Sequence, residues 1–249
     1  MSVAVRFESD CRTVCARRAW ACVALVGLVA CVAAPAQAAV APLKVSWDRA
    51  SVLSRDAQTA LEQVLATGDN AGAPFVVIDK RRARLWVFDA RGHPNGSTPV
   101  LLGFARGDDT VPGIGDKPLA QVRPGERTTP AGRFVAEHGR NIKGEDIIWV
   151  DYDAAVSMHR VKDVHRSDRR EQRLRSRSIA DNRISYGCIN IPKAFYEQVL
   201  LGVVGRAHPV VYVLPETRPV ATIFKAGAAT AAPGGEPGRR RAGDRHGIG

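Results

Sequence analysis

Residues 74–88, PFVVIDKRRARLWVF, set the architecture that the rest of the chain has to accommodate. Two runs of five residues, Phe75 to Asp79 and Arg84 to Phe88, are rich in Val, Ile and aromatic side chains. The basic turn Lys80-Arg81-Arg82 lies between them. Short β-branched and aromatic runs bounded by turn residues are typical of strands. We therefore predict a pair of β-strands here.

More short strands are predicted on both sides of a long irregular segment. They cover residues 99–105, 132–137, 146–152, 155–159 and 209–214, and a turn is expected over 91–96, where Asn95-Gly96 occurs. Residues 106–130 are rich in Gly, Pro and Asp, and so long a loop is usually functional or mobile. Two helices are predicted, 51–67 with Gly68 as its C-cap and 192–203 with Pro192 in its first turn. The pattern indicates a mainly β (α+β) fold.

The first 38 residues have the pattern of a secretory signal peptide. Arg17-Arg18 precedes an apolar run over 19–34, and Pro35-Ala36-Gln37-Ala38 supplies a small-x-small cleavage site. The run is shorter than the roughly 20 residues of a stable membrane span. We expect export to the periplasm or cell envelope, with a lipoprotein anchored at Cys31 as the minor alternative.

The remaining chain divides into three parts. Residues 39–73 form a leader and the N-terminal helix, and residues 74–215 form the predicted catalytic domain. Residues 216–249 are predicted to be a disordered, basic tail rich in Ala, Gly and Pro.

Charge points to an anionic partner. The formal net charge is +11, of which the signal peptide holds +2, so +9 remains after cleavage. Residues 160–184, here called the excursion, hold eight Arg, one Lys and four acidic residues, which indicates a solvated lid or loop. Export and the lack of interleaved aromatic and basic residues argue against nucleic acid. The sequence has no His-Glu-x-x-His, no paired Cys in the mature chain and no P-loop, so no metal or cofactor is expected.

One cysteine, Cys188, remains after the signal peptide is removed. It follows Ser185-Tyr186-Gly187 and precedes Ile189-Asn190. Glycine permits a tight turn that brings successive N–H groups together, and a nearby helix start favours thiolate over thiol. These features suit a nucleophile beside an oxyanion hole. An inert buried cysteine is the alternative.

A cysteine nucleophile needs a base, and His159 is the first candidate. It closes the alternating run Val156-Ser157-Met158-His159, so a rigid strand should hold its ring on the face opposite Met158. His165, inside the excursion, is the second candidate. The other histidines are less well placed, in turns, at a strand end or in the tail: His93, His138, His208 and His246.

These segments together resemble the catalytic domain of the L,D-transpeptidase (YkuD-like) family. That family has a His at a strand end, a Ser/Thr-His-Gly-Cys turn followed by an aliphatic residue and Arg or Asn, and an upstream Thr-Pro-x-Gly-x-Phe segment. The matching pieces are Met158-His159, Ser185 to Asn190 and Thr129 to Phe134, and the resemblance covers roughly residues 74–214. The chain departs from the pattern at Tyr186, which replaces the His of the turn, and in the longer interval between His159 and Ser185.

The resemblance implies a YkuD-like β-sandwich or barrel and acyl transfer through a thioester. Cys188 would attack a peptidoglycan stem peptide at its third residue and release D-alanine, with His159 as base. Backbone N–H groups of Tyr186, Gly187 and Cys188 would hold the oxyanion. Ser185 would help to orient the base, and Asn190 would hold the turn or touch substrate.

The acyl acceptor stays open at this point: a stem amine, a protein lysine or water. Water would make the protein an L,D-carboxypeptidase or endopeptidase. A catalytically inactive wall-binding module is the further alternative, because of Tyr186. The oligomeric state is not indicated by the sequence.

Overall fold

The structure, a computed structural model, describes residues 52–163, 165–205 and 207–224. All of them belong to one unit, residues 42–249. The predicted signal peptide and the lipoprotein alternative at Cys31 lie outside the described residues. None of the described helices is long and apolar enough to cross a membrane.

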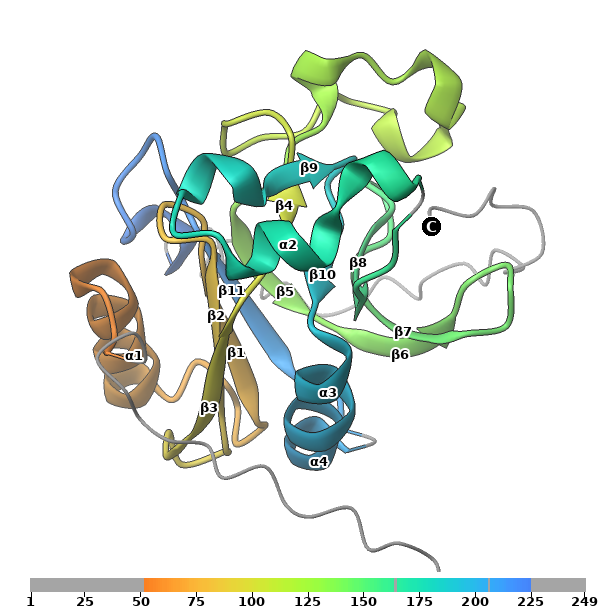
Figure 1. Cartoon of the computed structure of the whole chain (residues 1–249). Helices are drawn as coiled ribbons and strands as arrows, with labels where there is room; N and C mark the ends of the chain where they lie inside the picture. Colours follow the sequence, from red (N-terminus) through yellow and green to blue (C-terminus); the bar gives the residue numbers. More distant parts are fainter. Residues whose placement is uncertain (1–51, 164, 206, 225–249) are drawn as a thin grey trace, which may run out of the picture. The chain divides into compact units, whose positions relative to one another are not determined.

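The residue 74–88 hairpin lies near the centre of a five-stranded sheet (Figure 1). Strands β1 (Phe75–Asp79) and β2 (Arg84–Phe88) pair antiparallel, with Phe75 opposite Phe88. The sheet order is β3-β2-β1-β11-β5, in which β3 is Pro94–Pro99, β11 is Val210–Leu214 and β5 is Gly132–Val135. All residues of β1 and β11 are buried, since both faces of the sheet are covered.

A second sheet has four strands in the order β10-β8-β7-β6. These are β10 (Ile189–Ile191), β8 (Val156–Arg160), β7 (Asp146–Asp151) and β6 (Glu137–Arg140). The short strands β4 (Leu102–Gly103) and β9 (Arg183–Ser185) form a separate parallel pair.

The main core is shared by the two larger sheets, which contribute Val76 and Ile78 from one and Ile148, Met158 and Ile189 from the other. Neither sheet closes on itself within the described residues. The mainly β (α+β) class is thus confirmed, and of the two forms expected the structure has the layered one rather than the barrel.

Helix α1 (Arg55–Thr67) covers the other face of the five-stranded sheet (Figure 1). Its Ala57, Ala60 and Val64 pack with aromatic residues of that sheet, among them Phe75 and Trp86. The helix begins four residues later than predicted. Its N-cap is Ser54, whose Oγ accepts from the N–H of Ala57 at 3.1 Å. It ends at Gly68 as predicted, with a left-handed φ of 66°.

The second predicted helix is present as three consecutive pieces. These are α3 (Lys193–Phe195), the π-helical turn η7 (Tyr196–Leu200) and α4 (Leu201–Val204). Tyr196 and Leu200 reach the main core, so this helix covers an end of the layer that carries β10.

The Asn95-Gly96 dipeptide lies in strand β3 and not in the expected turn. The turn falls earlier, where Asp89 accepts from the N–H groups of Arg91 and His93. A Cβ on Gly96 would stand 3.1 Å from atoms of both Phe195 and Val199. Glycine is needed there for close packing against the helix, and a sequence pattern does not distinguish that need from a turn.

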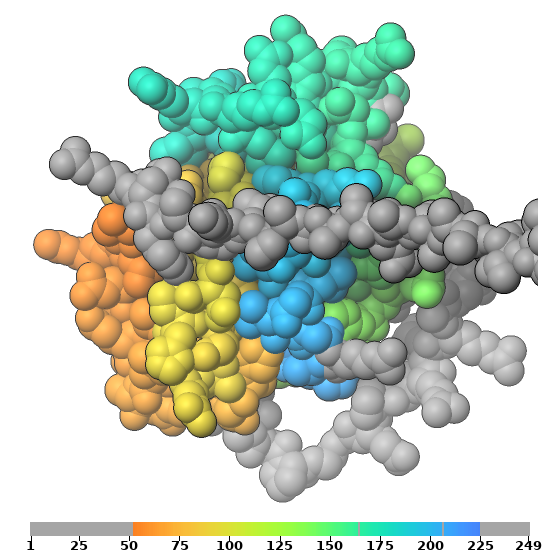
Figure 2. Space-filling model, turned by 60° about the horizontal axis from the view of Figure 1, so that its bottom comes forward, coloured from red at the N-terminus to blue at the C-terminus, as the bar shows by residue number. Residues whose placement is uncertain are grey.

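The excursion is folded and only partly solvated. It contains η5 (Arg166–Asp168), α2 (Arg170–Arg175) and η6 (Ile179–Asn182), gathered at the top of Figure 2 in teal. Leu174 packs with Leu101 and Val161 in a small core of its own. The loop over 106–130 holds three short 3₁₀ turns, η2 (Ile114–Asp116), η3 (Leu119–Gln121) and η4 (Pro124–Glu126).

Residues 216–224, assigned to the tail by composition, are folded. Val220 and Ile223 join the core beneath α1. Asp108 accepts hydrogen bonds from the backbone N–H groups of residues 216, 217 and 218. The first nine residues of the predicted tail are therefore folded, and residues 225–249 lie outside the described residues.

Candidate active site

Strands β8 and β10 bring the predicted nucleophile and base to one face of a sheet. The two strands are parallel, with Met158 opposite Ile189 and His159 opposite Asn190. Met158 and Ile189 point into the main core. Because side chains alternate along a strand, His159 and Asn190 occupy the other face. Cys188 and Ser157 share that face, with Sγ and Oγ 3.6 Å apart.

The turn before Cys188 is held by a serine and a threonine. Ser185 Oγ accepts from the N–H of Gly187 at 3.1 Å and donates to the carbonyl of Cys188 at 2.6 Å. Thr129 Oγ1 donates to the carbonyl of Gly187 at 2.7 Å. Of the three N–H groups expected to form an oxyanion hole, that of Gly187 is thus engaged within the turn in this state. Ser185 supports the turn, and contact with His159 is not among its hydrogen bonds.

Gly187 has to be glycine for two reasons. Its φ is +135°, a conformation that other residues rarely adopt, and a Cβ would stand 2.9 Å from the carbonyl oxygen of Thr128. The predicted helix follows this turn, one residue from its expected start at Pro192, but a short strand separates it from Cys188. Strand β10 comes next, and the helix begins at Lys193.

The Cys188 thiol is buried and neutral in this state. The residue is 2% exposed, and Sγ donates to the carbonyl of Ala155 at 3.6 Å. Burial raises the pKa of the Cys188 thiol, and the hydrogen bonds with Ser157 and the charge of Arg170 only partly offset this. The environment is nevertheless polar at the sulfur itself, with a hydroxyl and a carbonyl in contact.

The His159 ring is fixed at both nitrogens. Nδ1 lies 2.8 Å from the carbonyl of Arg160, which can only accept, so Nδ1 carries the proton. Nε2 then accepts from Asn190 Nδ2 at 3.2 Å. Burial lowers the pKa of His159, which favours the neutral base. In this state Nε2 is hydrogen-bonded to Asn190 and the thiol to the Ala155 carbonyl, so proton transfer from the thiol to Nε2 requires both groups to exchange partners.

The other described histidines are exposed. His165 precedes η5 at the surface, and His93, His138 and His208 are exposed as well. His246 lies outside the described residues. Of the two candidate bases, the structure brings only His159 to the strand pair with Cys188, and its role as base stays a prediction.

Tyr186 is held against the 106–130 loop. The Arg127 guanidinium stacks 3.9 Å from the centre of the Tyr186 ring, and Arg127 also donates to the carbonyl of Val122 at 3.1 Å. A cation stacked on an aromatic face is stabilising. The side chain that replaces the expected histidine therefore connects the turn to the long loop.

One predicted residue has a partner that was not expected, and one participant was not found from the sequence. Asn190 was expected to hold the turn or touch substrate, and in the structure it bonds to His159. Arg170 was read as part of a solvated excursion, yet it is buried, and its Nη1 donates to Asn190 Oδ1 at 2.7 Å. The one signal in the sequence is the spacing of four residues between Arg170 and the apolar Leu174, which places both on one face of a helix. In the structure they lie on α2 and both are buried.

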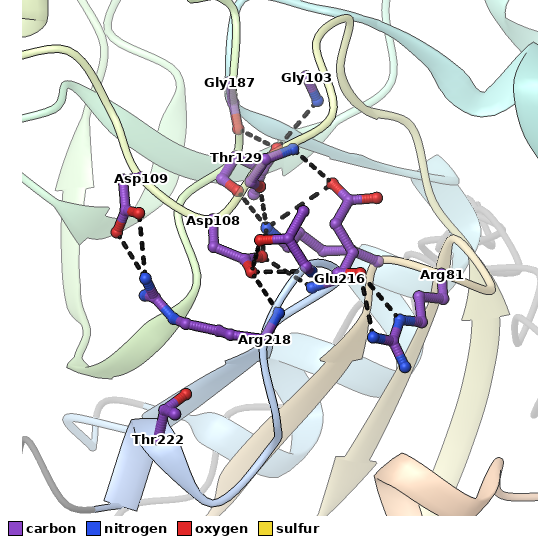
Figure 3. Close-up of polar contacts among 12 residues, drawn as sticks. Arg81, Gly103, Asp108, Asp109, Thr129, Gly187, Glu216, Arg218 and Thr222 are labelled. Carbon is purple, nitrogen blue, oxygen red and sulfur yellow. Dashed lines mark hydrogen bonds and ion pairs between the residues drawn. The ribbon is translucent and has the colours of Figure 1, made fainter.

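A buried ionic cluster lies behind the turn (Figure 3). Lys80 Nζ donates to Asp108 at 2.9 Å and to the carbonyl of Thr129 at 3.0 Å. Burial alone would raise the pKa of Asp108. Hydrogen bonds from Thr217, the Glu216 N–H and Lys80 instead hold that pKa well below its usual value. Since Thr129 also bonds to Gly187, the cluster is tied to the turn of the candidate site.

No group of three or more His, Cys, Asp or Glu side chains within the described residues is arranged to hold a metal ion.

Comparisons with known proteins were made on sequence and on structure. A scan against models of protein families finds no match, and a search of curated proteins finds none. Among solved structures, the chain is similar to the helical cell shape determining protein Pgp2 of Campylobacter jejuni, at 18% identity and a TM-score of 0.39. That match covers 59% of this chain and 49% of Pgp2.

A second similar structure is the C442S mutant of the Enterococcus faecium L,D-transpeptidase, at 18% identity and a TM-score of 0.34, covering 57% of this chain and 50% of that one. The catalytic domain of the E. faecium L,D-transpeptidase is similar at 18% identity and a TM-score of 0.36, covering 57% and 98%. This chain thus spans about half the length of the first two.

Proposed function

We propose that this protein is an exported cysteine acyltransferase of the L,D-transpeptidase type that acts on peptidoglycan stem peptides. The observation that carries the proposal is the parallel pairing of β8 and β10, which sets Cys188 and His159 on one face of adjacent strands. The Gly187 turn and the polar contacts of the sulfur support it. The sequence resemblance supplies the substrate class.

The reaction would begin when substrate displaces the resting hydrogen bonds. His159 Nε2 would accept the thiol proton, and Cys188 Sγ would bond to the carbonyl carbon of the third stem residue. Collapse of the tetrahedral intermediate would break the peptide bond, and D-alanine would leave with the proton from His159. A stem amine would then attack the thioester, lose its proton to His159 and release the thiol.

The backbone N–H groups near Cys188 would bind the oxyanion. One of them, on Gly187, must first leave Ser185 Oγ. Loss of one oxyanion donor typically costs about 3–4 kcal/mol of barrier. A substrate that opens this contact would therefore gain catalysis from it.

The test is covalent capture of Cys188 by a carbapenem, followed by turnover of purified muropeptides. We expect one adduct on the wild-type protein, detected by intact mass, and none on Cys188→Ala. Ser157→Ala serves as matched control, because it changes the neighbour of the sulfur and keeps the nucleophile. Absence of both adduct and turnover would refute the proposal.

The rival function is a catalytically inactive wall-binding module. The observation in its favour is the buried sulfur, whose proton is directed at the Ala155 carbonyl. The same experiment separates the two. Peptidoglycan binding that is equal in the wild type and Cys188→Ala, without an adduct, is the result expected of the module. Turnover with water alone as acceptor would identify the carboxypeptidase or endopeptidase alternative.

A further inference from the structure

Arg170 differs from a solvated surface arginine. Its side chain is 6% exposed, although it comes from the excursion. Its backbone N–H donates to Asp163 Oδ1 at 2.8 Å, and its Nε donates to Asp168 Oδ2 at 3.1 Å. Two acidic residues of the excursion thus hold the backbone and Nε of Arg170, and its Nη1 is directed at Asn190.

We propose that Arg170 is a positioning residue for His159, acting through the side-chain amide of Asn190. The excursion then holds the imidazole in one tautomer and one orientation. The inference rests on the proposed function only in treating His159 as the base. The hydrogen-bond relay itself consists of atoms within contact distance.

The relay is determined by which groups can donate. A guanidinium has donors only, so Arg170 Nη1 at 2.7 Å must face the oxygen of the Asn190 amide. The amide nitrogen is then turned toward His159 Nε2, 3.2 Å away, and toward the Cys188 carbonyl at 3.5 Å. Nε2 has to accept, and Nδ1 has to donate to the Arg160 carbonyl. Arg170 therefore determines the orientation of the Asn190 amide, and that amide determines the tautomer of the His159 ring.

The relay also opposes protonation of His159. An imidazolium would direct its Nε2–H at the amide nitrogen of Asn190, and two donors would face each other. Turning the amide over would remove that conflict but would place its NH₂ against Arg170. Either arrangement leaves a buried donor without an acceptor, which is unfavourable. The hydrogen bonds of the relay are therefore all satisfied when the His159 ring is neutral.

The charges around His159 act in both directions. Burial is the main cause that lowers the pKa of His159, the positive charges of Arg170 and Lys162 lower it further, and Glu145 raises it. The hydrogen bond to the Arg160 carbonyl also raises it. Removing Arg170 takes away one cation and frees the amide to turn. Both changes favour the imidazolium.

The experiment follows the His159 ring by ¹⁵N NMR, titrating the full chain with pH. Arg170→Met keeps an unbranched side chain and removes its charge and donors. We expect the pKa of His159 to rise by roughly one pH unit or more, and we expect the single Nδ1–H tautomer to become a mixture. Arg173→Met is the matched control. It lies on the same helix and bonds to the Asp168 and Asp181 carbonyls.

The control separates a relay from general support by the excursion. An unchanged pKa and tautomer in Arg170→Met would overturn the proposal, as would an equal shift in Arg173→Met. If Arg170→Met does not fold, Asn190→Asp tests the same relay, because a carboxylate still accepts from Arg170 and now also accepts from a charged ring. We expect a raised pKa of His159 in that variant, and no shift would contradict the relay.

The ring titration needs no acyl substrate. A protein that gives neither a carbapenem adduct nor muropeptide turnover but shows the Arg170-dependent shift would refute the proposed function and keep the relay. A protein that forms the adduct but shows no shift in the pKa of His159 would refute the relay and keep the proposed function.

Discussion

Gly187→Ala is the sharpest perturbation of the turn that presents Cys188. The backbone at this position has φ of +135°, and holding alanine in so sparsely populated a region costs roughly 1–3 kcal/mol. The added Cβ would also meet the Thr128 carbonyl oxygen at 2.9 Å, and both partners are buried. Overpacking of this kind adds roughly 1–3 kcal/mol. We expect a loss of about 2–6 kcal/mol in the free energy of unfolding.

The assay is urea unfolding, with thermal unfolding as a second measurement. For a folded domain of this size each 1 kcal/mol lowers Tm by about 2–4 °C, so even the lower bound gives a shift of about 4–8 °C. Gly125→Ala is the matched control. Gly125 has no atom within 4 Å of the position of an added Cβ, and its φ is not positive. That variant should stay within about 0.5 kcal/mol of the wild type.

Comparison of the two variants tests whether Gly187 has the described conformation. If Gly187→Ala unfolds at the same urea concentration as Gly125→Ala, the turn does not have the conformation described. Alkylation of Cys188 by iodoacetamide reports on the same turn independently. Because the Thr129 bond to Gly187 would be strained in the alanine variant, the buried thiol should react faster there than in the control.

Three more predictions concern groups around the site. Lys80→Met should cost about 3–5 kcal/mol in unfolding free energy, measured in urea, because it leaves the buried Asp108 carboxylate without its cation; a cost below 1 kcal/mol would contradict this. Ser157→Ala should slow alkylation of Cys188 at neutral pH, because hydrogen bonds with Ser157 lower the pKa of that thiol; an unchanged rate would show that they do not act on the sulfur. The hydrogen bonds from Arg123 and Lys117 lower the pKa of Glu126 to about 2 from 4.5, so its contribution to stability is complete above pH 4.5 and is lost as pH falls toward 2. Glu126→Gln should remove this part of the acid sensitivity, and an identical pH profile in circular dichroism would refute the assignment.

The parts of the fold that the sequence predicted are those with strong local signals. The 74–88 hairpin follows from β-branched and aromatic residues in two short runs, and the Gly68 cap follows from the end of an apolar period. Asn95-Gly96 was misread because the same dipeptide serves a turn or a close contact. The distinction depends on Phe195, a hundred residues away, and no local pattern contains it.

The same limit explains what was found of the candidate site. Cys188, His159 and Gly187 stand in recognisable short motifs, and strand alternation placed the ring opposite Met158. Arg170 has no motif, and its role arises from the folding of the excursion onto β10. The burial of Arg170 depends on tertiary contacts, and the neighbouring sequence does not distinguish it from the surface arginines around it. The helix after Cys188 begins within one residue of its predicted start, but three residues of strand separate it from the thiol.

In the resting site the thiol proton and the His159 nitrogen that would accept it have different hydrogen-bond partners. The thiol proton faces the Ala155 carbonyl, and the His159 lone pair faces the Asn190 amide. Each of these hydrogen bonds is worth about 1 kcal/mol net, so substrate binding can readily exchange them. In the proposed relay Asn190 is itself bound by Arg170, so an exchange of hydrogen bonds at His159 would be coupled to the excursion. The segment that lengthens the interval between the predicted base and the predicted nucleophile would thereby influence whether the two can meet.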